Sequence, residues 1–170
     1  MRVYWTVMVL LALGFAGLRS VRAAEDDKAW KDYVEAGSNY VRAAESATNG
    51  RDRRENIERA AGQFQAAVNI GQNKSNWRPI VLAADGYVRM ISVASGNDKD
   101  TYTDFATGAL DSAVTIAKAK ADRQGLRDIL RVYRRLAGMS AGQKLRVIEA
   151  KIKSIEQDAE GVPETKGRER

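Results

Sequence analysis

Apolar residues recur along the chain at intervals of three and four positions, the spacing that places side chains on one face of an α-helix. The clearest stretch, at about 28–47, has an apolar face made of Trp30, Tyr33, Val34, Gly37, Tyr40, Val41 and Ala44. The same period predicts further helices over about 53–71, 77–95, 101–120, 123–137 and 140–157. Two pairs that resemble capping boxes, Thr101 with Asp104 and Ser140 with Gln143, would begin the fourth and sixth helices. Since no stretch alternates as a half-buried strand does, the predicted fold class is all-α.

The first two predicted helices are echoed by the next two. Three residues recur 47 positions later: Trp30 as Trp77, Tyr40 as Tyr87, and Arg42 as Arg89. Others recur after 46 positions: Gly62 as Gly108, Ala67 as Ala113, Val68 as Val114, and Ile70 as Ile116. A fixed period of about 20 to 50 residues is typical of stacked helical units, because each unit buries its apolar face against the next. The pattern therefore predicts three antiparallel helical hairpins stacked as a short solenoid, with a six-helix bundle as the alternative.

Both units share an ordered set of small and bulky residues. The set is Gly37, Tyr40, Ala60, Phe64 and Ala67 in the first unit and Ala84, Tyr87, Ala106, Leu110 and Ala113 in the second. In this order the residues resemble the tetratricopeptide repeat (TPR), although the period is longer than the roughly 34 residues of that family. The resemblance implies a TPR-like scaffold in which the first helix of each unit lines a concave groove. We expect Tyr40 and Tyr87 to occupy equivalent buried positions between the helices of successive hairpins.

The two ends of the chain differ from the helical part. Residues 1–23 have the form of a signal peptide, because a basic start precedes the uncharged run 3–18 and Val21-Arg22-Ala23 fits a cleavage site. We therefore expect export, to a periplasm or as a secreted protein; the alternative is a membrane anchor through residues 3–18. The TPR-like domain would cover 24–157. Glycine, proline and mixed charges over 158–170 predict a disordered tail.

The chain contains neither cysteine nor histidine. This composition excludes Ser-His-Asp and Cys-His nucleophiles, histidine-ligated zinc and disulfides. The acidic clusters Glu25-Asp26-Asp27 and Asp98/Asp100/Asp104 lack the ligand series of a calcium loop. We predict a protein that is not an enzyme and has no metal, cofactor or small-molecule substrate; a carboxylate hydrolase is a much weaker alternative.

Positive charge is concentrated in the C-terminal third, where residues 118–153 hold 11 basic and three acidic side chains. Five arginines lie along one side of the fifth predicted helix: Arg123, Arg127, Arg131, Arg134 and Arg135. Within that helix only Asp128 could neutralise them. Such a face suits an acidic protein segment or an anionic membrane or polysaccharide surface. Nucleic acid is a poor partner for an exported protein.

A second arginine pattern follows the repeated tyrosines. Arg42, Arg89 and Arg135 each stand two residues after a tyrosine, a step that turns the side chain about 200° from the packed ring. They would face the groove as a ladder, unless pairs within helices, Asp85 with Arg89 and Arg42 with Glu45, occupy them. The predicted partner-binding residues are Arg42, Arg89, Arg131, Arg134 and Arg135. The sequence thus predicts an exported non-catalytic scaffold that binds an acidic segment of a protein partner; the alternative is a peripheral factor that binds anionic membrane or polysaccharide surfaces through 118–153.

Overall fold

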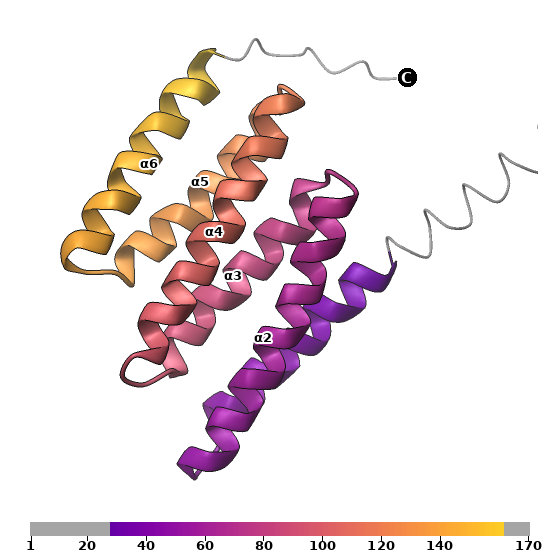
Figure 1. Ribbon diagram of the computed structural model, residues 1–170, viewed down its shortest axis with the longest axis vertical. Coiled ribbons are helices and arrows are strands. Elements are labelled where there is room, and N and C mark those ends of the chain that lie inside the picture. The colour runs from indigo at the N-terminus through magenta and orange to yellow at the C-terminus, as the bar shows by residue number, and fades with distance from the viewer. Residues whose placement is uncertain (1–27, 162–170) are drawn as a thin grey trace, which may run out of the picture.

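A computed structural model describes residues 28–161, and these residues fold entirely into helices joined by short turns (Figure 1). The first helix covers residues 28–46 of this part. It is followed by α2 (Gly50–Asn73), α3 (Trp77–Val93), α4 (Asp98–Ala119), α5 (Arg123–Gly138) and α6 (Gly142–Gly161). Since the described residues contain no strand, the prediction of an all-α fold is confirmed.

The helices lie in two layers. In Figure 1, α2, α4 and α6 form the nearer layer, while the first helix, α3 and α5 lie behind them. Helix α3 occupies the centre, because it packs against α2, α4 and α5. Helix α5 packs in turn against α4 and α6. The stacking of these helices as three hairpins of a TPR-like solenoid remains a prediction.

The core is tightest where Phe64 of α2 lies against two glycines. A Cβ atom at Gly86 of α3 would lie 2.2 Å from the Phe64 Cζ atom, and one at Gly37 of the first helix would lie 2.6 Å from Cε1. Side chains at either position would push the helices apart, since protein interiors are close-packed. These two glycines therefore let the first helix, α2 and α3 meet around one buried ring.

Tyr87 and Tyr40 are not equivalent in burial, contrary to the prediction. Tyr87 is 1 % exposed and contacts Phe64 from α2 and Phe105 from α4, with both ring-centroid distances at 5.6 Å. Tyr40 is only partly buried, and the Arg59 guanidinium lies 5.9 Å from its ring centroid. The difference follows from position, because Tyr87 is on the central helix and is covered from both sides.

A polar network joins α4, α5 and α6. The buried Tyr133 on α5 donates its hydroxyl hydrogen to Asp111 Oδ1 on α4, at an O–O distance of 2.5 Å. Lys151 on α6 donates to both oxygens of Asp111, at 2.7 and 2.5 Å. Asp111 thus accepts charge-assisted hydrogen bonds from two neighbouring helices, a stronger class of hydrogen bond than the neutral one.

Several predicted helix ends were wrong. Helix α2 begins at Gly50, because the Asn49 side chain caps it by accepting from the Asp52 N–H at 2.8 Å. Helix α4 begins at Asp98, and the Thr101 hydroxyl donates to the Asn97 carbonyl inside it. The Ser140 hydroxyl donates to the Leu136 carbonyl of α5, so it satisfies the end of that helix. Neither predicted capping box lies at a helix start, because α4 begins at Asp98 and α6 at Gly142. Each hydroxyl instead donates to the carbonyl four residues before it.

The sixth helix continues into the segment predicted as a tail. Helix α6 extends to Gly161. Its last turns are held against the fold, because Asp158 forms an ion pair with Lys118 of α4 and Ala159 is buried. Residues 1–27 and 162–170 lie outside the described part of the chain, so the signal peptide, the anchor and the remaining tail stay predictions. No helix within residues 28–161 has the length and apolarity needed to cross a membrane.

Trp77 connects the start of α3 to the start of α5. Its Nε1–H donates to Asp122 Oδ2 at 2.7 Å, while Asp122 Oδ1 accepts from the Gly125 N–H at 2.7 Å as the N-cap of α5. The fit is close, because a Cβ at Gly125 would lie 2.8 Å from Trp77 Cε2. One carboxylate thus caps a helix and satisfies a largely buried indole.

Replacing Asp122 with alanine should lower the free energy of unfolding by about 1 to 3 kcal/mol, because the cap is lost and the Trp77 N–H is left unpaired. Urea unfolding measures this change. Glu55→Ala is the control, since it removes only an exposed i, i+4 pair with Arg59 and should cost about 0.5 kcal/mol or less. Equal losses in the two variants would contradict the role of Asp122.

Candidate functional site

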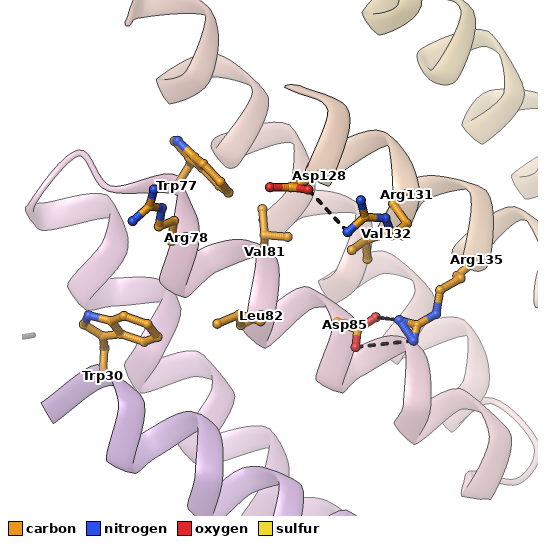
Figure 2. A pocket seen from close by; sticks show the side chains of 10 residues that line it. All are labelled: Trp30, Trp77, Arg78, Val81, Leu82, Asp85, Asp128, Arg131, Val132 and Arg135. Atoms are coloured by element: carbon orange, nitrogen blue, oxygen red, sulfur yellow. Dashed lines mark hydrogen bonds and ion pairs between the residues drawn. The ribbon is translucent and has the colours of Figure 1, made fainter. Parts of the chain in front are cut away.

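The main candidate site is a hollow of about 350 Å³ on the face formed by the first helix, α3 and α5 (Figure 2). Its lining consists of Trp30 from the first helix, of Trp77, Arg78, Val81, Leu82 and Asp85 from α3, and of Asp128, Arg131, Val132 and Arg135 from α5. This volume falls within the roughly 300 to 1,000 Å³ of typical ligand sites. We call this hollow the tryptophan groove.

Helical spacing explains why these residues share one face. On α3 the lining residues recur every three or four positions, from Trp77 and Arg78 through Val81 and Leu82 to Asp85. On α5 the same spacing relates Asp128, Arg131, Val132 and Arg135. The groove is therefore a strip along two neighbouring helices, and Trp30 adds a wall from a third.

The centre of the tryptophan groove is apolar. Leu82 is 45 % exposed, whereas Val81 and Val132 are buried. Figure 2 shows Leu82 between the Trp30 indole and Asp85. The Arg78 guanidinium lies 5.5 Å from the Trp77 ring centroid, a cation–π contact at the edge of the groove. An exposed leucine beside two indoles offers a surface for an apolar side chain of a ligand.

Charged side chains border this apolar centre, and most of them are paired. Arg135 holds Asp85 through both terminal nitrogens, with the Nη2–Oδ2 distance at 3.5 Å, and Arg131 lies 3.3 Å from Asp128. Burial raises the pKa of Asp85, although the charges of Arg135 and Arg89 oppose that shift. Together with Arg78, the groove contains three guanidiniums and two carboxylates, so its balance is positive.

The structure brings together only part of the predicted partner-binding set. Arg131 and Arg135 line the tryptophan groove. Arg134 points to α6, where it lies 2.8 Å from Glu156. Arg42 donates to Asn39 of its own helix, and Arg89 lies 3.8 Å from Glu45 of the first helix. Arg42, Arg89 and Arg134 are thus outside the groove lining.

Two arginines of the predicted ladder, Arg89 and Arg135, form ion pairs between helices. Both acids that could have formed pairs within a helix, Glu45 and Asp85, instead reach an arginine of the next helix in the back layer: Glu45 pairs with Arg89, and Asp85 with Arg135. Each of these two arginines therefore meets a carboxylate of a neighbouring helix, and only Arg135 lines the groove. An open row of three guanidiniums was therefore a wrong prediction. Exposed pairs of this kind contribute about 0 to 1 kcal/mol each.

The cations of residues 118–153 are also less free than the sequence suggested. Acids on other helices pair with them: Lys118 with Asp158, Arg134 with Glu156, Lys144 with Asp104 and Asp100, and Lys151 with Asp111. Arg123 and Arg127 also have interaction partners. Counting acids only within the fifth helix overstated the unpaired charge, because the neutralising carboxylates lie on α4 and α6 as well. The five arginines do not form an unpaired row.

Sequence reasoning missed the apolar part of the groove. Trp30 and Trp77 stand at equivalent positions of the repeat, and Trp77 is buried, yet both line the groove. A signal for Leu82 was present: it lies two positions after Ile80, off the buried stripe of α3. An apolar residue off the core stripe of a helix is a candidate for binding.

The side chains that line the tryptophan groove can provide ionic and apolar contacts to a ligand. Within residues 28–161 no group of three or more acidic side chains is placed to hold a metal ion. Both carboxylates of the tryptophan groove are paired with arginines, so the groove offers guanidinium donors and an apolar surface. Comparison of the chain with protein-family models, curated proteins and solved structures gave no match.

Proposed function

We propose that the protein is an exported, non-catalytic helical scaffold that binds an acidic segment of a partner protein in the tryptophan groove. The observation that carries this proposal is the exposed Leu82, which lines the hollow together with two indoles and three guanidiniums. A leucine that is 45 % exposed in a hollow, rather than on a convex surface, favours a ligand with an apolar side chain. The positive balance of the lining favours carboxylates beside it.

Binding would exchange one set of ion pairs for another. Partner carboxylates would accept hydrogen bonds from Arg131 and Arg135, now paired with Asp128 and Asp85. The planar guanidinium suits this exchange, because it can bind two carboxylates through different edges or one through two parallel bonds. Arg78 requires no such exchange, because its guanidinium lies over the Trp77 ring. The apolar centre would supply most of the affinity and the arginines would set the orientation.

The alternative, binding of anionic membrane or polysaccharide surfaces through residues 118–153, has weaker support. Such binding needs several cations on one open face. Six basic residues of this region pair with acids: Lys118, Arg131, Arg134, Arg135, Lys144 and Lys151. The groove is the better candidate because its apolar centre adds a feature that a solvated charged surface lacks.

Tryptophan fluorescence provides a direct test. Trp30 and Trp77 both line the groove, so an acidic peptide that contains leucine should change their emission on binding. The double variant Arg131→Gln/Arg135→Gln should weaken binding about tenfold or more, because each lost charge-assisted hydrogen bond is worth about 1.5 to 3 kcal/mol. Affinity should also fall at high salt.

Two controls separate groove binding from general attraction. Arg134→Gln on the same helix removes an arginine that pairs outside the groove, and it should leave affinity unchanged. A peptide with glutamine in place of each glutamate should bind at least tenfold more weakly, by the same energies of charge-assisted bonds. Equal affinity for the two peptides, or an equal effect of all the arginine variants, would refute the proposal.

A further inference from the structure

A second hollow, of about 400 Å³, lies at the opposite end of α3 from Trp77. Helix α2 contributes Gly50, Arg51, Arg53, Arg54 and Ile57, and the turn from α3 to α4 contributes Val93, Ser95 and Asp98. Three guanidiniums thus share one concave surface with a single carboxylate. This basic hollow shares no lining residue with the tryptophan groove.

The arginines of the basic hollow stand at the unfavourable end of their helix. A helix N-terminus carries partial positive charge, which attracts anions and repels cations. The first five residues of α2 include Arg51, Arg53 and Arg54 but only one acid, Asp52, and its last turn has no basic residue. Helix α4 has the usual order, with two acids in the first turn and Lys118 in the last. Helix α2 therefore places positive charge where the local field opposes it.

Little inside the described part of the chain compensates these guanidiniums. Arg51 lies 3.6 Å from Asp52, but its side chain is 90 % exposed, so this pair is weak. Arg53 donates to the Ala47 carbonyl at 3.1 Å, a bond that holds it at the turn without neutralising it. Arg54 forms no ion pair with any residue of 28–161. Asp98 leaves the lining with two more positive than negative charges.

We propose that the basic hollow binds a phosphate monoester. A phosphate monoester presents three strongly accepting oxygens and a charge near −2, which matches three guanidinium donors better than a carboxylate with two oxygens does. Its charge would also offset the repulsion between the arginines and the positive end of α2. The Ser95 hydroxyl adds a neutral donor at the rim, and Ile57 and Val93 form an apolar wall for the carbon part of the ligand. The phosphate could belong to a soluble metabolite or to the headgroup of a lipid such as phosphatidic acid.

The test compares one phosphate group in two settings. Glycerol 3-phosphate is titrated into the purified full chain by calorimetry, and phosphatidylcholine vesicles with and without phosphatidic acid are used in sedimentation. We expect the ligand to bind in at least one setting and to raise the melting temperature. The triple variant Arg51→Gln/Arg53→Gln/Arg54→Gln should weaken binding at least about tenfold. Without ligand it should melt no lower than the unmodified protein, because it removes an unfavourable charge arrangement.

A charge-matched variant makes the result specific to the hollow. Lys120→Gln/Arg146→Gln/Lys153→Gln removes three cations elsewhere on the surface and should keep the affinity. Binding of the soluble phosphate alone would identify a metabolite site, and binding of phosphatidic acid vesicles alone would identify a lipid headgroup site. The absence of binding in both settings, or an equal loss in both triple variants, would overturn the proposal. Since the tryptophan groove is untouched in both variants, acidic-peptide binding provides an independent check that they are folded.

Discussion

Replacing Tyr87 with alanine should lower the free energy of unfolding by about 3 to 5 kcal/mol, the usual cost of removing a large aromatic side chain from a core. Tyr87 is 1 % exposed and lies between Phe64 of α2 and Phe105 of α4. Its loss would leave a cavity where α2, α3 and α4 meet. Urea or thermal unfolding of the purified protein measures the change.

Tyr40→Ala is the matched comparison, because Tyr40 is the residue that the repeat aligns with Tyr87. Tyr40 is only partly buried and has a cation–π contact with Arg59, so fewer packing contacts are lost when it is truncated. Tyr40→Ala should therefore lower the free energy of unfolding by about 1 to 2 kcal/mol. Equal losses at the two positions would mean that the first helix buries its tyrosine as deeply as α3 does. That result would restore the equivalence suggested by the sequence.

The sequence predicted the helices well because their apolar faces are long and regular. On α3, Ile80, Ala84, Tyr87 and Ile91 recur at helical spacing, and all four are buried. Helix ends were less predictable, since they depend on competition for backbone groups. Asn49 can end a helix or cap one, and its side chain caps α2. Such choices depend on tertiary context rather than on the local residue pattern.

The candidate sites were harder to predict, because they depend on contacts between helices. The acids that neutralise the basic region lie up to 50 residues away in sequence, as Asp85 does from Arg135. Periodicity could place Trp30 and Trp77 on equivalent helices but could not place them around one hollow. The three arginines at the start of α2 lie at the positive end of a helix, where cations are unfavourable. This was evident only once the structure showed that α2 begins at Gly50. Knowledge of the helix ends and of neighbouring helices was needed for both hollows.

Alkaline pH should destabilise the fold through its buried tyrosines. Burial, with a smaller contribution from Tyr102, raises the pKa of Tyr87 from 10.0 to about 12. Burial and the hydrogen bond to Asp111 raise the pKa of Tyr133 further above its usual range. The folded state therefore holds these protons after the unfolded chain has released them. The stabilisation is complete below about pH 10, the pKa of tyrosine in the unfolded chain, and is lost as pH rises toward the folded-state pKa.

Each of these tyrosines should reduce the free energy of unfolding by at most about 1.4 kcal/mol per pH unit above pH 10, less whatever solvent screening removes. For Tyr87 the loss ends near its folded-state pKa of about 12. Tyr87→Phe is the cleanest variant, because the hydroxyl makes only long hydrogen bonds, at 3.3 Å to the Ala61 carbonyl and 3.4 Å to Gln65. It should match the unmodified protein near neutral pH and exceed its stability at about pH 11. Urea unfolding across this range measures both curves, and a constant difference between them would show that the Tyr87 hydroxyl titrates alike in the folded and unfolded states.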